Sequence, residues 1–90
     1  MPEVRKQIIF HGRVQGVGFR YMAMHYASLL GLSGWVRNEP NGTVSMEAQG
    51  SESAITRLLE ALNQRPYISI EWMDTKELPL MREERRFRIR

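Results

Sequence analysis

Two segments of this chain carry apolar residues at the spacing of helices that bury one side. The first stripe begins near residue 19 and the second near residue 55, and both repeat at intervals of three and four positions. Such helices need an apolar surface to pack on, which the rest of the chain must provide. The stripes consist of Phe19, Met22, Ala23, Tyr26, Ala27 and Leu30, and of Ile55, Leu58, Leu59 and Leu62.

The segments around the two helices have the composition of β-strands. Residues 39–42 (Glu-Pro-Asn-Gly) supply a hairpin turn, and Ile68, Ile70 and Trp72 are expected on one face of their strand. The order βαββαβ predicts an α+β, ferredoxin-like sandwich, an antiparallel sheet with two helices on one face, as a single domain over residues 1–90. The predicted strands are 4–13, 34–38, 43–49 and 67–78, with a short edge strand at 87–90.

The handedness of strand connections predicts how this sheet is ordered. A right-handed crossover makes the strands at 4–13 and 34–38 parallel, with the strand at 43–49 between them. The loop after the first strand and Asn38, at the end of the second, should therefore lie at the same edge of the sheet.

Composition excludes several kinds of site. The chain has 90 residues and no cysteine, so a disulfide framework, a zinc–thiolate site and a thiol nucleophile are all excluded. His11 and His25 do not have the spacing of metal ligands, and we expect neither a metal nor another cofactor. The net charge of +3 favours an anionic partner.

No apolar stretch is long enough to span a membrane, and no hydrophobic region follows the first charged residues as it would in a secretory signal. We therefore expect no membrane contact and a cytoplasmic location. The length leaves room for one core, and we expect the chain to act as a monomer.

A glycine loop between the first strand and the first helix is the sharpest candidate for a binding site. Residues 12–20 read Gly-Arg-Val-Gln-Gly-Val-Gly-Phe-Arg, and glycines let successive backbone N–H groups turn toward one point beside a helix N-terminus. An arginine in the first helical turn, here Arg20, is normally unfavourable unless an anion is bound there. The alternative is a tight strand-to-helix turn without a ligand. The loop has neither the lysine of a Walker loop nor the third glycine of a dinucleotide-binding motif.

Asn38 is the second candidate, at the end of the predicted strand 34–38. Its uncharged amide is suited to orienting a nucleophile near a bound anion. Asn is also common as the first residue of a turn, and that structural role remains open.

Together these two motifs resemble the acylphosphatase family. Residues 12–20 are similar to the family's signature loop, and Gly34-Trp35-Val36-Arg37-Asn38, followed by Gly42, Val44 and Gly50, resembles its second signature. The resemblance extends from about residue 5 to residue 90. It implies that Arg20 and Asn38 are catalytic, Arg20 binding phosphate and Asn38 orienting the attacking water. The phosphate-binding residues that it implies are Gln15, Gly16, Val17, Gly18, Phe19 and Arg20.

The implied activity is hydrolysis of the carboxyl-phosphate bond of a small-molecule acyl phosphate, with inorganic phosphate or sulfate as a ligand. A carboxylate with a pKa of about 4 leaves without protonation, so neither a general acid nor a metal is needed. In the family, the phosphate of the substrate is thought to accept the proton of the water.

Two other functions fit the same topology. An RNA-recognition module would need exposed aromatic residues on its central strands, and residues 43–49 contain none, so we expect no nucleic acid partner. A non-catalytic acylphosphatase-like domain would bind a phosphorylated metabolite or a partner protein. The presence of both Arg20 and Asn38 argues against that alternative.

Overall fold

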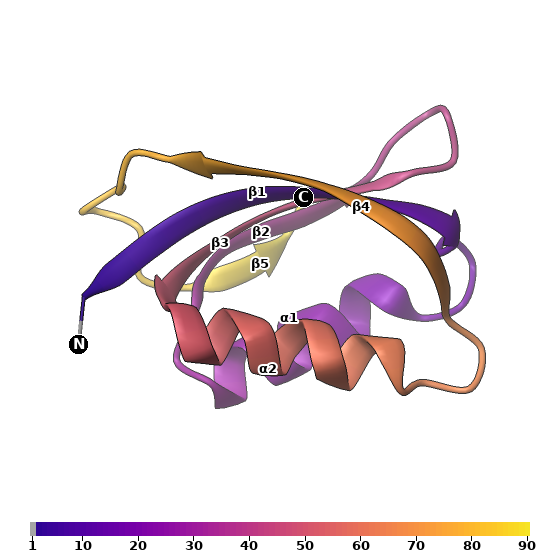
Figure 1. The fold of residues 1–90 in the computed structure, drawn as a ribbon, viewed down its shortest axis with the longest axis horizontal. Coiled ribbons are helices and arrows are strands. Elements are labelled where there is room, and N and C mark those ends of the chain that lie inside the picture. Colours follow the sequence, from indigo (N-terminus) through magenta and orange to yellow (C-terminus); the bar gives the residue numbers. More distant parts are fainter. Residues whose placement is uncertain (1) are drawn as a thin grey trace.

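A computed structural model describes residues 2–90 and confirms the predicted order of elements. Both helices cover one face of a single sheet, whose strands follow the order β4-β1-β3-β2-β5 (Figure 1). The elements are β1 (Glu3–Arg13), α1 (Phe19–Leu29), β2 (Ser33–Asn38), β3 (Val44–Ser51), α2 (Glu52–Asn63), β4 (Ser69–Leu78) and β5 (Phe87–Ile89).

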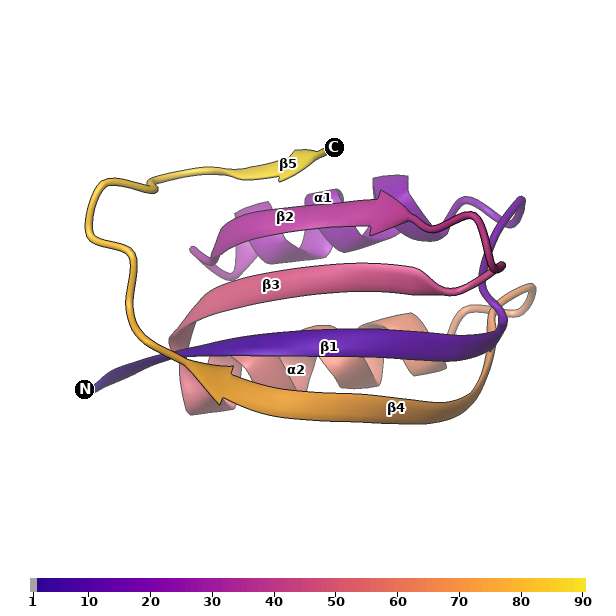
Figure 2. The ribbon, with the colours of Figure 1, turned by 90° about the horizontal axis from the view of Figure 1, so that it is seen from above.

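The central strand β3 fixes the relative direction of β1 and β2. It pairs antiparallel with β1, where Phe10 lies opposite Val44, and antiparallel with β2, where Asn38 also lies opposite Val44. The strands β1 and β2 are therefore parallel to each other, as the crossover rule predicts. The loop after β1 and the turn after β2 consequently lie at the same end of the sheet (Figure 2).

The sheet is mixed, so the prediction of an antiparallel sheet is wrong at one edge. The short strand β5 pairs parallel with β2, and Trp35 of β2 lies opposite Arg88. The cause is the path of residues 79–86, which connect β4 at one edge with β5 at the other and return the chain in the direction of β2 (Figure 2).

Polar contacts hold this connection against the sheet face opposite the helices. The side-chain amide of Gln49 in β3 forms two hydrogen bonds with the backbone of Met81. Its Oε1 accepts from the N–H of Met81 at 2.8 Å, and its Nε2 donates to the carbonyl oxygen of Met81 at 3.0 Å. Arg5 of β1, which is only 1% exposed, lies 2.8 Å from both Glu47 and Glu84. The route of the connection thus depends on side chains from the two central strands.

A β-bulge overturns the prediction that Trp72 shares a face with Ile68 and Ile70. In the β1–β4 ladder Gly12 pairs with Ile70 whereas His11 pairs with Trp72, so Glu71 is an extra residue on β4. Ile70 packs against the core, but Trp72 lies on the opposite face, 54% exposed, with its ring stacked on His11 at 4.4 Å. One inserted residue reverses the alternation of sides.

The core lies between the sheet and the two helices. It contains the central strand residues Ile8, Phe10 and Met46, together with the helical stripes predicted from the sequence. Ser51 caps α2 by accepting a hydrogen bond from the backbone N–H of Ala54 at 3.1 Å. Neither α1 nor α2 has the length and apolar character that crossing a membrane requires.

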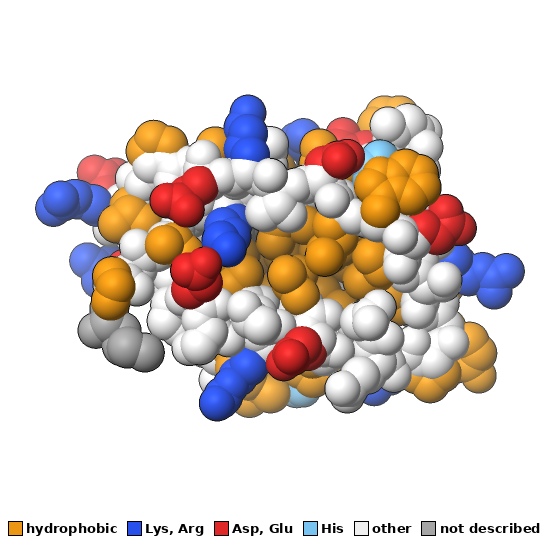
Figure 3. All heavy atoms as spheres, viewed as in Figure 1, with side chains coloured by type: hydrophobic (Ala, Val, Ile, Leu, Met, Phe, Trp, Pro, Cys, Tyr) orange, Lys and Arg blue, Asp and Glu red, His pale blue; other side chains and the backbone are white. Residues whose placement is uncertain are grey.

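The edge strand β4 is only partly covered by α2. Figure 3 shows apolar side chains exposed in the hollow between these two elements. The cavity has a volume of about 300 Å³, and Leu59, Ile70 and Met73 are among its lining residues.

Candidate active site

The loop between β1 and α1 has a backbone that only its glycines adopt easily. Gly16 and Gly18 have φ angles of 73° and 80°, in the left-handed region. Gly18 is the N-cap residue of α1, and because it has no side chain it leaves the first N–H groups of the helix without a side-chain acceptor. The first turn also contains no acidic residue. The helix N-terminus is therefore prepared to accept an anion.

Asn38 reaches the same place from the end of β2. A cavity of about 110 Å³ brings it together with the loop and with Arg20 in the first turn of α1. The Oδ1 atom of Asn38 is buried, yet no group among residues 2–90 donates a hydrogen bond to it. A buried acceptor without a donor costs about 1–3 kcal/mol, so a ligand with an O–H or N–H group would be favoured here. The cavity lining comprises Val14, Gly16, Gly18, Phe19, Arg20, Tyr21 and Asn38.

Arg20 supplies the positive charge of this cavity. Within residues 2–90 no carboxylate lies at ion-pair distance from its guanidinium. The nearby carboxylate of Glu39 is instead bound by Arg37, with 2.9 Å between Nε and Oε2. Hydrogen bonds from the Ser45 hydroxyl and from Arg37 lower the pKa of Glu39, so this carboxylate stays ionised. Arg20 thus remains available to an anionic ligand.

The predicted loop residues contribute in different ways. Phe19 lies in the core, 1% exposed and 4.8 Å from the ring of Phe10, so its side chain is committed to packing. Val17 packs against the core as well. The side chain of Gln15 is hydrogen-bonded to the β2–β3 turn. Neither Gln15 nor Val17 is among the residues that line the cavity.

Tyr21 and Val14 also line the cavity, although neither is among the phosphate-binding residues that the resemblance implies. Tyr21 is 65% exposed, so its side chain is not part of the core. Its position next to Arg20 in the first turn of the helix is the one feature of the sequence that indicates a place in the site. Val14 is buried and directly follows β1.

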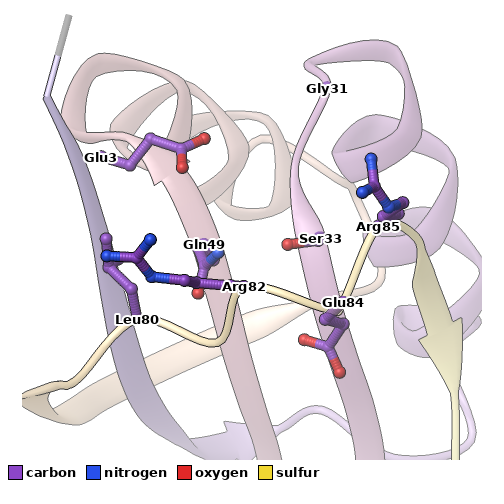
Figure 4. A pocket seen from close by; sticks show the side chains of 8 residues that line it. All are labelled: Glu3, Gly31, Ser33, Gln49, Leu80, Arg82, Glu84 and Arg85. Carbon is purple, nitrogen blue, oxygen red and sulfur yellow. The ribbon is translucent and has the colours of Figure 1, made fainter.

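A larger cavity, of about 530 Å³, lies at the other end of the sheet beneath the β4–β5 connection. It holds charges of both signs, from Glu3, Glu84, Arg82 and Arg85, and the two arginines stand on opposite sides of it (Figure 4). The described residues that line it include none from the glycine loop and none from the first turn of α1 or α2. The small cavity at Arg20 and Asn38 is therefore the better candidate for phosphate chemistry. Among residues 2–90 no group of three His, Cys, Asp or Glu side chains is arranged to hold a metal ion.

Comparison with known proteins identifies the family of this chain. The family model "Acylphosphatase" matches residues 6–89. The acylphosphatase of Geobacillus thermodenitrificans is 42% identical over 86 residues, which cover 94% of this chain and 92% of that protein.

Solved structures give the same result. The crystal structure of the Bacillus subtilis acylphosphatase superimposes with a TM-score of 0.87 at 36% identity, covering 96% of this chain and 97% of that one. Full-length HypF in its phosphate- and nucleotide-bound form gives a TM-score of 0.85 at 28% identity, but this chain covers only 12% of it. The agreement of family model, sequence relatives and fold establishes that this chain belongs to the acylphosphatase family, enzymes that hydrolyse acyl phosphates.

Proposed function

We propose that this chain hydrolyses acyl phosphates by direct attack of a water molecule on phosphorus, without a metal ion. The backbone amides of residues 15–19 and the guanidinium of Arg20 hold the phosphoryl group. Inorganic phosphate, as the product, and sulfate, as its analogue, bind in the same place. The observation that carries the proposal is the buried Oδ1 of Asn38, which has no donor among residues 2–90 and shares a cavity with Arg20 and the glycine loop.

Asn38 orients the nucleophile in this mechanism. A water molecule that donates one O–H to Asn38 Oδ1 satisfies the buried acceptor and is held beside the bound phosphoryl group. Because the amide carries no charge, it fixes the position of the water without repelling the phosphate. Positioning of this kind, together with electrostatic stabilisation, supplies almost all of the catalysis in phosphoryl transfer.

The leaving group explains why the site needs little else. As the oxygen of the water bonds to phosphorus, the bond between phosphorus and the acyl oxygen breaks, and its electron pair departs with the carboxylate. A carboxylate with a pKa of about 4 needs no proton from the enzyme. The proton of the water passes to an oxygen of the substrate's own phosphate, so the chain supplies no general base. Charge on the equatorial oxygens is met by Arg20 and the backbone N–H groups.

The first test is an assay of purified protein with an aryl acyl phosphate, with and without a chelator. We expect the same kcat in both conditions, together with competitive inhibition by inorganic phosphate. Saturating phosphate should also raise Tm, because it binds the folded state only. Loss of turnover on chelation, restored by magnesium or zinc, would refute the metal-free mechanism.

Two variants separate the proposed roles of the site residues. Arg20→Lys keeps the charge but loses the planar donor fork, so phosphate affinity and rate should fall together. Asn38→Ala should lower kcat about 10²-fold while changing phosphate affinity little, since its contact is made with the water. Exposed residues of α2 provide matched controls, Arg57→Lys and Asn63→Ala. A near-normal kcat in Asn38→Ala, or the same loss of phosphate binding as in Arg20→Lys, would contradict this assignment.

A further inference from the structure

Gln15 connects the two halves of the site through its side chain. Its Nε2 donates one hydrogen bond to the carbonyl oxygen of Glu39, at 2.7 Å, and another to that of Thr43, at 2.8 Å. A primary amide has only these two N–H donors, so both are used. The side-chain nitrogen of Gln15 is therefore committed to the β2–β3 turn and not available to a phosphate.

The two acceptors of Gln15 are the ends of that turn. The N–H of Glu39 donates to the carbonyl of Thr43 at 2.9 Å, and the N–H of Gly42 donates to the carbonyl of Glu39 at 3.1 Å. Inside the turn, Asn41 Oδ1 accepts from both the N–H and the hydroxyl of Thr43, at 3.1 and 2.7 Å. The turn is thus a closed unit, and it begins at the residue directly after Asn38.

We propose that Gln15 is a positioning residue that sets the distance between the glycine loop (residues 12–20, from here on the phosphate loop) and Asn38. This inference rests on the function proposed above, and it concerns how the side-chain amide of Asn38, which orients the water, is held at the correct distance from the bound phosphate. The loop is attached to β1 and α1, whereas Asn38 belongs to β2, and β3 separates β1 from β2 in the sheet. The two hydrogen bonds of Gln15 join these parts directly at the end of the sheet where the chemistry takes place (Figure 2).

Gln15→Glu tests this role because it keeps the shape of the side chain and removes both donors. An ionised carboxylate would face two carbonyl oxygens and push the turn away from the loop. We expect kcat to fall about 10- to 100-fold, the scale of a misplacement of about 1 Å, with KM and the inhibition constant of phosphate changed less than threefold. Gln15→Met removes the donors without adding a charge and should show the same split between kcat and KM. Gln64→Glu, at the exposed C-cap of α2, is the control for the added charge.

A double-mutant cycle with Asn38→Ala distinguishes positioning from a general structural role. If Gln15 acts through Asn38, Gln15→Met should cost little once Asn38 is alanine, so that the double variant has nearly the kcat of Asn38→Ala alone. The increase in Tm with saturating phosphate confirms that each variant is folded and has an intact loop.

The outcomes separate this inference from the proposed function. Additive losses in the double variant, or a normal kcat in both Gln15 variants, would overturn the role of Gln15 and leave the mechanism intact. A rise in the phosphate inhibition constant as large as the fall in kcat would mean that Gln15 shapes the phosphate loop instead. If Asn38→Ala itself keeps its kcat, both the role of Gln15 and the proposed water-orienting role of Asn38 fail.

Discussion

Arg5 offers the most quantitative test of what holds this fold together. Its guanidinium is buried on the sheet face opposite the helices, with Nε 2.8 Å from Glu47, Nη1 2.8 Å from Glu84 and 3.2 Å from Gln49. The side chains of Glu47 and Glu84 are 16% and 10% exposed. Substitution of Arg5 by methionine, which preserves much of its apolar stem, would leave two largely buried carboxylates without their cation.

The expected cost follows from this burial. Removing one partner of a buried ion pair destabilises a protein by about 3–5 kcal/mol, since the remaining charge is left uncompensated. The small exposure of both carboxylates lets water solvate them in part, so we expect the lower end, about 3 kcal/mol. With a urea slope of about 1–1.5 kcal/mol/M for a chain of this size, the unfolding midpoint of Arg5→Met should fall by about 2–3 M.

The neighbouring residue supplies the control. Lys6 pairs with Glu52 at 3.3 Å, where the carboxylate is 66% exposed, and a surface pair of this kind is worth about 0.2–1 kcal/mol. Urea unfolding of Arg5→Met and Lys6→Met, followed by circular dichroism, compares the two environments one residue apart. If Arg5→Met loses no more stability than Lys6→Met, the buried cluster does not stabilise the fold in the way argued. In a double-mutant cycle, the variant that combines Arg5→Met with Glu84→Gln should lose less stability than the two single variants lose in sum.

Two further changes test local features of the sheet. Gly34→Ala should lower the free energy of unfolding by about 2–4 kcal/mol in the same urea assay, because at φ 137° a Cβ would collide with the Glu47 carbonyl. Gly31→Ala is the control: Gly31 has φ 72° and open space around it, so the loss should be about 1–2 kcal/mol. Equal losses in the two variants would contradict the argument. Ser45→Ala should raise the pKa of Glu39, measured by NMR titration, because its hydroxyl is the main group that lowers it; Ser53→Ala should leave this pKa unchanged. An unaltered Glu39 pKa in Ser45→Ala would refute this assignment. Because the folded-state pKa is lowered, Glu39 stabilises the protein at pH values above its ordinary pKa, and this stabilisation is lost as the pH falls through the lowered value.

Much of the fold could be predicted because it depends on regular patterns. The helical stripes at Phe19–Leu30 and Ile55–Leu62 repeat with the period of a helix, and the crossover rule then places Asn38 at the edge of the sheet that carries the glycine loop. The sequence pattern therefore predicts that Arg20 and Asn38 lie close together, and both line the small cavity.

Features that depend on a single insertion or on distant polar contacts could not be predicted. Trp72 changes sides because Glu71 is an extra residue in the ladder, and counting alternate positions gives no sign of a bulge. The parallel pairing of β5 depends on Arg5 and Gln49, which hold a connection that comes more than thirty residues after Gln49. The side chain of Gln15 binds carbonyls of a turn far along the chain, and nothing in the composition of the loop indicates that contact.

The position of β3 between β1 and β2 has a consequence for how the enzyme becomes active during synthesis. The phosphate loop and Asn38 both precede β3 along the chain, yet the strands that carry them do not touch and are aligned only through it. β1 also pairs with β4, which is still later in the chain, and Arg5 lies opposite Leu78 as well as Gln49. Pairings between such distant residues close large loops and form slowly. We therefore expect catalytic competence to arise late in folding, because a nascent chain that ends after Asn38 contains both proposed catalytic side chains, Arg20 and Asn38, but not the strand that aligns them.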